Sequence, residues 1–468
     1  MARTTAHTAM AAELWRRLRS IRRNARLYLL SNTLQAVTAG AIVVIYSLFL
    51  VALGYSTSAI GLVLVVGSLG AGLAIVPAAP LVRRLGWRNT LIWSNLIGGV
   101  SVAIQLFIPT LPVILITSLG VGASVAMYLI VNAPFLAANS TTEERTALFG
   151  LSNALNYLAA VVGSLLGGIL PQLFASPTVL HSPLITRISP LLVSGQQARV
   201  YQLSLLAVGA IALPSIIPIF FIHDEPRQAQ VTLPAAAIPA TALTWTRARE
   251  RMRRVAHDAK IFFSGVVGRF SLPHAIIGFG AGLFVPYFSL YFVDYLHTST
   301  VYFGVLSAVQ TVLLAIGALL AAPLASRFGK LVVALVAQSA SLPFLLALGL
   351  FQVVPVASVA YLFRGFLMNV SDPALQTYLM EAVPEDGRVQ ASEVYNLGFQ
   401  VTGSAGSGLG GWLLAVGGTH LPFLIAFALY AIAIALLAVW FLGGRDTPAK
   451  PAPLGDATVG ADGRQCVP

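Results

Sequence analysis

Long apolar runs recur along the chain, separated by short segments that are rich in charged residues, Pro or Gly. All of the runs reach the ~20 residues that a helix needs to cross a bilayer. They form two sets of six. The runs lie at 27–53, 57–81, 90–109, 112–138, 147–172 and 200–222, and then at 263–294, 301–325, 331–351, 355–380, 389–416 and 421–443. This pattern predicts an all-α polytopic membrane protein with 12 transmembrane helices.

The composition excludes a soluble protein. Only 9% of the 468 residues are charged and 57% are hydrophobic, whereas about 25% of an ordinary soluble chain is charged. We therefore expect the lipid bilayer as the main partner, with no nucleic acid bound in spite of the net charge of +12, and a monomeric chain. The single cysteine, Cys466, excludes an internal disulfide and a cysteine-based metal site.

The distribution of Lys and Arg predicts how the chain is divided and oriented. Cytoplasmic loops of membrane proteins are enriched in these residues, and only Arg187 and Arg199 fall in loops on the other side. Both termini are then cytoplasmic, in a plasma or bacterial inner membrane. The basic start could instead imitate an organellar transit peptide, but an interfacial helix fits better. The predicted parts are a basic N-terminal segment 1–26, a six-helix bundle 27–222, a cytoplasmic linker 223–262, a second bundle 263–443 and a cytoplasmic tail 444–468.

An internal repeat relates the two sets of runs at a constant offset of 243 residues. The matched residues include Arg, Pro and Asn in register, which chance would rarely supply in an apolar chain. Two parallel copies of six helices predict pseudo-symmetric bundles with a binding site between them near the midplane. The matches are Gly61 with Gly304, Pro80 with Pro323, Arg84 with Arg327, Gly86 with Gly329, Pro112 with Pro355, Gly122 with Gly365, Arg145 with Arg388, Asn153 with Asn396, Gly163-Ser164 with Gly406-Ser407, and Gly167-Gly168 with Gly410-Gly411.

Two motifs resemble a known family. The segment 83–88 (RRLGWR) after the second run, echoed by 326–330 (SRFGK) after the eighth, resembles the loop motif of the major facilitator superfamily. The Gly-rich segment 163–168 resembles the fifth-helix motif of its drug:proton antiporter branch. The departures are Arg83 and Ser326 where the loop motif has an acid, Ser164 where the antiporter motif has Pro, and a fourth run without charge. The resemblance implies a 12-helix transporter with alternating access, and its antiporter branch implies proton-driven efflux.

Charged residues inside the predicted spans are the strongest candidates for chemistry, because a charge at mid-bilayer costs ~2.5–3.5 kcal/mol. They lie in the second half: Arg364 and Asp372 in the tenth span, Glu393 in the eleventh, and Asp294 at the outer end of the seventh. Arg364 lies ~13.5 Å from the start of its span, near the bilayer centre.

Tyr361, Arg364 and Asp372 share one face of the tenth span at helical spacing. Arg364 is either a fixed cation for an anionic substrate, a charge that controls Asp372, or one partner of an acid pair that only locks the bundle. Glu393 shares a face with Asn396 and Gln400. It is a gating partner, a proton carrier or a solvated residue at the cytoplasmic mouth.

The first half offers neutral polar groups. They contact either the substrate or neighbouring helices, whose mutual hydrogen bonds contribute about 0.6 kcal/mol each. Tyr287, Tyr291 and Asp294 form either an outer rim or a set of interfacial aromatics. The neutral candidates are Asn32 and Gln35 in the first span, and Tyr128 and Asn132 in the fourth.

Charged residues at the inner helix ends predict latches that break when the transporter opens. Surface ion pairs contribute only about 0–1 kcal/mol, so such latches are easily released. We expect Arg84 to meet Glu143 or Glu144, and Arg327 to meet Glu381 or Glu385. The gating candidates are Arg83, Arg84, Arg88, Glu143, Glu144, Arg327, Lys330, Glu381 and Asp294.

No motif of an enzyme or ATPase is present, and no metal-ligand spacing occurs. We therefore expect no cofactor, and a proton gradient as the source of energy. The preferred interpretation is a secondary transporter that exports a small molecule in exchange for protons. The alternatives are a uniporter or importer of a polar or anionic solute, and a membrane receptor or scaffold that does not transport.

Overall fold

The computed structural model describes residues 22–141, 144–180, 182–223, 265–384 and 387–442, and this part is helical throughout apart from its short connections. Most of the predicted basic segment 1–26 and of the linker 223–262, all of the tail 444–468, and Glu143 lie outside the described residues, as do the side chains of Arg83 and Glu393.

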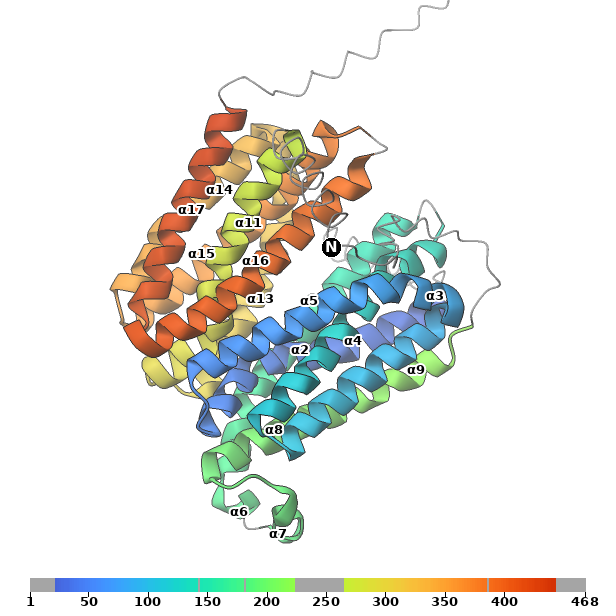
Figure 1. The fold of residues 1–468 in the computed structure, drawn as a ribbon, viewed down its shortest axis with the longest axis vertical. Helices are drawn as coiled ribbons and strands as arrows, with labels where there is room; N and C mark the ends of the chain where they lie inside the picture. Colours follow the sequence, from blue (N-terminus) through green and yellow to red (C-terminus); the bar gives the residue numbers. More distant parts are fainter. Residues whose placement is uncertain (1–21, 142–143, 181, 224–264, 385–386, 443–468) are drawn as a thin grey trace, which may run out of the picture.

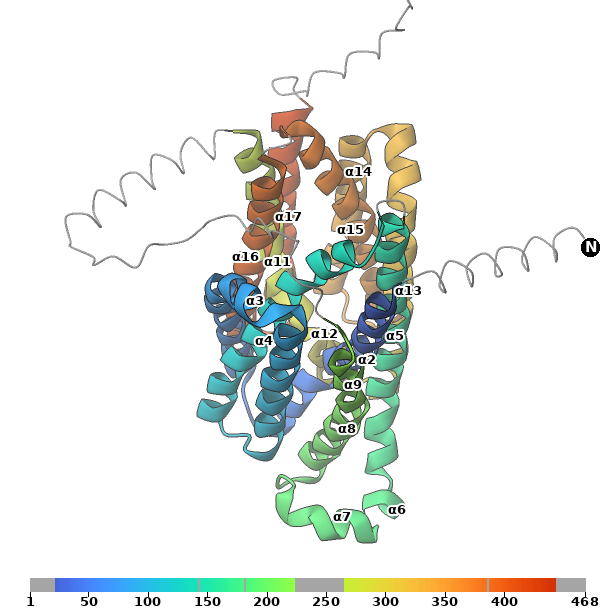
Figure 2. The ribbon, with the colours of Figure 1, turned by 90° about the vertical axis from the view of Figure 1, so that its right-hand side faces the viewer.

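The N-terminal half contains four long helices and a broken sixth span. They are α2 (Arg23–Ala52), α3 (Thr57–Phe107), α4 (Leu111–Ala138), α5 (Arg145–Ala175), α8 (Gln196–Ala212) and α9 (Ile216–Phe220). Two short helices, α6 (Pro177–Leu180) and α7 (Pro183–Ile188), project beyond the bundle after α5 (Figure 2).

The C-terminal half repeats this order with a seventh span that is broken near its end. Its helices are α11 (Val266–Phe284), α12 (Phe288–Leu290), α13 (Thr300–Phe328), α14 (Lys330–Leu350), α15 (Val354–Ala382), α16 (Arg388–Gly417) and α17 (His420–Phe441). A π-helical turn, η4 (Tyr291–Tyr295), follows α12.

Among the described residues, 11 helical segments are long and apolar enough to cross a membrane, with α3 counted as two. The less apolar α16 is 30 residues long and packs against α11 and α3, so it takes the place of the remaining span. The all-α fold predicted from the sequence is therefore confirmed.

The connection after each second span turns at a glycine. Gly86 has φ +81° inside α3, and its repeat partner Gly329 has φ +89° between α13 and α14. Only glycine adopts this left-handed region without steric cost. Both copies of the loop motif therefore need glycine at this position, because the backbone turns there with a positive φ.

The two halves converge at one end and diverge at the other (Figure 1). One end of the molecule contains the start of α2 together with Arg84, Arg145 and Arg327, and we call it the basic end. The other end contains the last residue of α2, and we call it the opposite end. Every hydrogen bond described between the halves belongs to the opposite end.

Candidate functional site

A matched pair of hydrogen bonds joins the two halves at the opposite end. Thr57 Oγ1 donates to the carbonyl oxygen of Gly411 at 2.8 Å, and Thr300 Oγ1 donates to that of Gly168 at 3.0 Å. Both donors and both acceptors are related by the offset of 243 residues. The contacts between α3 and α16 and between α13 and α5 are therefore copies of each other, and we call them the two seams.

Small residues let the helices approach closely at each seam. A Cβ atom on Gly61 would lie 2.8 Å from the carbonyl oxygen of Ser407, and one on Gly304 would lie 2.7 Å from that of Ser164. Ser164 and Ser307 also lie within hydrogen-bond distance, at 3.4 Å. The repeated glycines are thus explained by contact between the halves as well as within them.

Polar side chains continue the seam faces toward the basic end. On α16, Asn396 and Gln400 precede Ser407 and Gly411 at spacings of 4, 7 and 4 residues, which keeps all four on one helix face. Both Asn396 and Gln400 are exposed. Because Gly411 and Ser407 touch α3, this face points toward the N-terminal half rather than toward lipid.

The same arrangement occurs on α5. Asn153 and Tyr157 precede Ser164 and Gly168 at the same spacings, and Asn153 is exposed. Beyond the seams the two halves therefore present matched polar faces to each other.

Arg364 is buried in the C-terminal half, with 8% of its surface exposed. Its Nη2 donates to Tyr430 Oη at 2.7 Å, and its guanidinium carbon lies 4.6 Å from the centre of the Phe284 ring. Its Nε has no hydrogen-bond partner, and no carboxylate of the described residues forms an ion pair with it. The pairing of Arg364 with an acid, one of the three interpretations left open by the sequence, is absent among the described residues in this conformation.

Asp372 lies two turns further along α15 and contacts a different helix. Tyr395 of α16 donates its hydroxyl to an Asp372 oxygen at 3.4 Å. The ring of His274 stacks on Tyr395, with centroids 3.7 Å apart. Eight residues of helix separate Arg364 from Asp372 by about 12 Å along the axis, and no ion pair between the two side chains is described.

A network of neutral groups connects α2, α4 and α5 in the N-terminal half. Asn32 Nδ2 donates to Asn156 Oδ1 at 2.9 Å, and Tyr128 donates to Asn32 Oδ1. Tyr28 donates to Asn132 Oδ1 at 2.9 Å. In this conformation the predicted polar groups of α2 and α4 bind neighbouring helices. Gln35 similarly donates to Asn95 Oδ1 of α3 at 2.9 Å.

Asn32→Ala should lower the thermal stability of the protein measurably. The change removes two interhelical hydrogen bonds, each of which contributes about 0.6 kcal/mol in a membrane bundle. A loss of about 1 kcal/mol corresponds to a decrease of roughly 2–4 °C in Tm, measured by thermal unfolding in detergent. Asn153→Ala is the matched control, because no hydrogen bond of the Asn153 side chain is described. Equal Tm values for the two variants would contradict the network.

Charged residues at the basic end form one described ion pair, within a single half. Lys330 at the start of α14 pairs with Glu381 in the last turn of α15, where the sequence led us to expect Arg327. Arg327 instead lies over the ring of Phe328. Arg84 and Glu144 form no ion pair in the described part of the chain, and Glu143, the other partner predicted for Arg84, lies outside the described residues. Arg88 lies on α3 just beyond Gly86.

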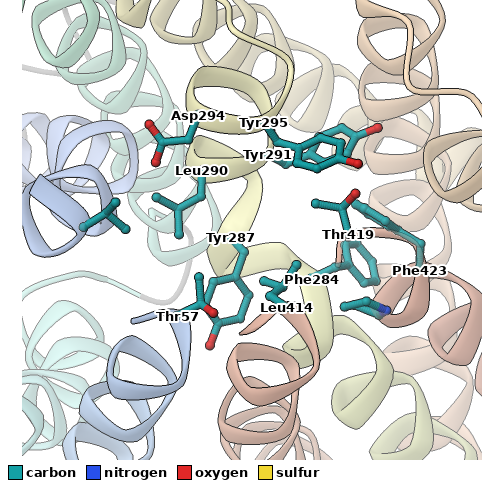
Figure 3. Close-up of a pocket in the computed structure, with 12 residues that line it drawn as sticks. Thr57, Phe284, Tyr287, Leu290, Tyr291, Asp294, Tyr295, Leu414, Thr419 and Phe423 are labelled. Atoms are coloured by element: carbon teal, nitrogen blue, oxygen red, sulfur yellow. The ribbon is translucent and has the colours of Figure 1, made fainter. Parts of the chain in front are cut away.

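The sequence-predicted outer rim lines a cavity of about 220 Å³ at the opposite end. Figure 3 shows Tyr287, Tyr291 and Asp294 in its wall, together with Thr57 from the other half. Sequence reasoning missed Thr57, Thr300, Tyr395 and Tyr430. For the two threonines the repeat itself carried a signal, because they match at the same offset as the glycines.

Comparison with solved structures shows the same fold over almost the whole chain. A bacterial homologue of the human lysosomal transporter Spinster, in an inward-facing and unoccupied conformation, has 15% identity and a TM-score of 0.68, with coverage of 91% of this chain and 98% of that one. A variant of the nucleoside transporter NupG has 12% identity and a TM-score of 0.66, covering 90% and 100%. A D-xylose–proton symporter has 14% identity and a TM-score of 0.62, covering 89% and 96%.

The sequence itself identifies the family. No curated protein sequence matches the chain. The pattern of the Major Facilitator Superfamily, however, matches residues 28–269 and 270–464, and each match covers one copy of the repeat. The chain therefore belongs to the major facilitator superfamily and is a membrane transporter, not an enzyme.

Proposed function

We propose that this protein exports a small organic solute across the cell membrane in exchange for protons, by alternating access with both termini in the cytoplasm. The observation that carries the mechanism is the matched pair of seam hydrogen bonds, Thr57 to Gly411 and Thr300 to Gly168. They close one end symmetrically while the polar faces of α5 and α16 diverge at the other. Rocking of the halves about the pseudo-twofold axis would open the seams and bring the basic ends together.

The seam hydrogen bonds add little to the energy needed for this rocking. Each seam hydrogen bond contributes about 0.5–1.5 kcal/mol net, and both are neutral. An opening cost of this size is within the range that solute and proton binding can supply. Such contacts suit a gate that must open and close repeatedly.

The burial of Arg364 supports a solute with an anionic group. A buried charge without a counter-ion is unfavourable, and Arg364 has an unpaired Nε and no described carboxylate partner. Tyr430 and Phe284 hold its guanidinium from two sides. A carboxylate or phosphate of the solute would supply the missing acceptor with charge-assisted hydrogen bonds.

Asp372 is our candidate for proton coupling, because it is an acid inside a span whose described contact is a neutral hydroxyl. One pH unit stores about 1.4 kcal/mol per proton, which drives about tenfold accumulation with one-to-one coupling. Asp372→Asn should lose this gradient-driven accumulation and keep solute-for-solute exchange. The measurement is flux in proteoliposomes with and without a pH gradient. Accumulation that persists in Asp372→Asn would assign coupling to another group.

The same screen tests the function as a whole. Proteoliposomes would be loaded with members of a panel of small organic acids, nucleosides and sugars, and efflux would be compared with the outside acidic or at equal pH. Efflux that is faster with acid outside supports proton antiport. Flux that ignores the gradient supports the alternative, a uniporter or importer of a polar or anionic solute. This alternative is favoured by the neutral network around Asn32 and by Arg364. No flux of any probe would count against transport of these solute classes.

A further inference from the structure

The cavity at the opposite end lies between the two halves and outside the polar faces that would line the solute path. Val51 and Thr57 line it from the N-terminal half, and Tyr287, Tyr291, Asp294 and Phe423 are among its walls in the C-terminal half. Thr57 also makes a seam hydrogen bond. The cavity is therefore complete only while this end is closed.

Four hydroxyl groups of its wall already donate their protons to other acceptors. Tyr287 donates to the carbonyl oxygen of Ser407 at 2.5 Å, Tyr291 to that of Leu348 at 2.9 Å, and Tyr295 to Gln352 Oε1 at 2.9 Å. Thr57 donates to Gly411. These side chains therefore offer a ligand their ring faces, methyl groups and hydroxyl oxygens as acceptors, but no free hydroxyl proton.

Asp294 supplies the charge of the cavity wall. No basic group of the described residues forms an ion pair with it, and it is exposed. His297 in the next turn of chain is close enough to act on it electrostatically. Asp294 lies in the π-helical turn η4, a feature that often marks functional sites. In Figure 3 its carboxylate points away from the rings of Tyr291 and Tyr295.

The size and shape of the cavity limit the ligand. An apolar cavity of about 150 Å³ binds benzene, so about 220 Å³ accommodates one aromatic ring and a short chain. In Figure 3 the rings of Tyr291, Tyr295 and Phe423 gather on the right of the view, and Asp294 lies on the left, above Leu290. This separation matches a molecule with an aromatic ring at one end and a cation at the other.

We propose that this cavity binds a small arylalkylammonium ion and that the bound ion holds the opposite end closed. The aromatic walls bind the ring, and Asp294 binds the ammonium group. A ligand shifts a conformational equilibrium by its difference in affinity for the two states. Because opening would carry Val51 and Thr57 away from the other walls, the ligand binds the closed state better and slows the transport cycle.

Cysteine protection tests this site with phenethylamine as the probe. In a Cys466→Ser background, Val51→Cys would be labelled with N-ethylmaleimide. When phenethylamine is present at ten times its Kd, about one-tenth of the protein remains without ligand. Labelling of Val51→Cys should therefore slow about tenfold. Gln400→Cys is the matched control on the solute path. Its labelling should not slow, because the proposed site is elsewhere.

Two comparisons identify the role of the charge. Phenethyl alcohol, which has the same ring without the ammonium group, should protect Val51→Cys only at about tenfold or higher concentration, because hydrogen bonds to charged groups are the stronger ones. Asp294→Asn should remove the difference between the two probes. Absence of protection, equal protection by both probes, or protection of Gln400→Cys would each overturn the proposal. Since labelling needs no transport, its failure leaves the proposed function untouched.

Discussion

Gly168→Leu should abolish transport and hold the opposite end open. A Cβ at this position would lie 2.8 Å from the Thr300 carbonyl oxygen and 3.0 Å from the Gly304 Cα, and both atoms belong to the other half. Overpacking of a close contact costs about 1–3 kcal/mol, which is comparable to the seam hydrogen bonds themselves. The halves can avoid this clash by separating, without unfolding. We therefore expect a population shift of roughly 10- to 100-fold.

The measurement is the distance between spin labels on Thr110→Cys and Val353→Cys, repeat-related positions at the starts of α4 and α15, in the Cys466→Ser background. Gly168→Leu should lengthen this distance and stop flux in proteoliposomes. Gly150→Leu is the control on the same helix, because nothing lies within 4 Å of a Cβ there. Thr300→Val removes a seam hydroxyl without much added volume, and it should lengthen the distance between the spin labels less than Gly168→Leu does. An unchanged distance in Gly168→Leu would contradict the seam as a gate.

Arg364→Met should abolish transport of an anionic solute while leaving the protein at least as stable. Truncation of one partner of a buried charge pair costs roughly 2–5 kcal/mol, so flux at low solute concentration should fall about thirtyfold or more. Replacement of buried charges by apolar groups of similar volume is often neutral or stabilising. The loss of the Tyr430 hydrogen bond and the Phe284 contact works against this gain, at about 1 kcal/mol each.

Flux and Tm measured on the same preparation separate the two roles of Arg364. Normal flux together with a lower Tm would mean that Arg364 only stabilises the bundle. Arg364→Lys retains the charge and should recover part of the flux. Arg187→Met makes the same chemical change at an exposed site in α7 and should alter neither quantity.

The fold was predictable because membrane helices must satisfy their backbone hydrogen bonds internally, so length and apolarity alone define the spans. The internal repeat then predicted that the spans form two pseudo-symmetric bundles. It could not tell which helix faces meet between them, because an internal repeat relates each residue to its copy and not to its neighbour in space. Thr57 therefore escaped notice although its copy Thr300 lies at the same offset as Gly61 and Gly304.

The candidate site was predicted in outline. Helical spacing placed Arg364 and Asp372 on one face of α15, but it could not show that Tyr430 and Tyr395, on two other helices, would bind them. A signal existed for Tyr430, because it is one of few polar groups in the otherwise apolar α17. Tyr28 lies one helical turn before Asn32 and could have been found by the same spacing. The ion pair of Lys330 with Glu381 depends on how α14 and α15 pack, which spacing along one helix does not determine.

The two seams also bear on how the protein responds to voltage. Their contacts are hydroxyl, carbonyl and glycine groups without formal charge, so parting them carries no net charge through the electric field of the membrane. A membrane potential of 100 mV changes the free energy of each elementary charge that crosses the membrane by about 2.3 kcal/mol. Any electrical sensitivity of the cycle must then arise elsewhere, from the solute, the proton, or displacement of Arg364 and Asp372 within the bilayer.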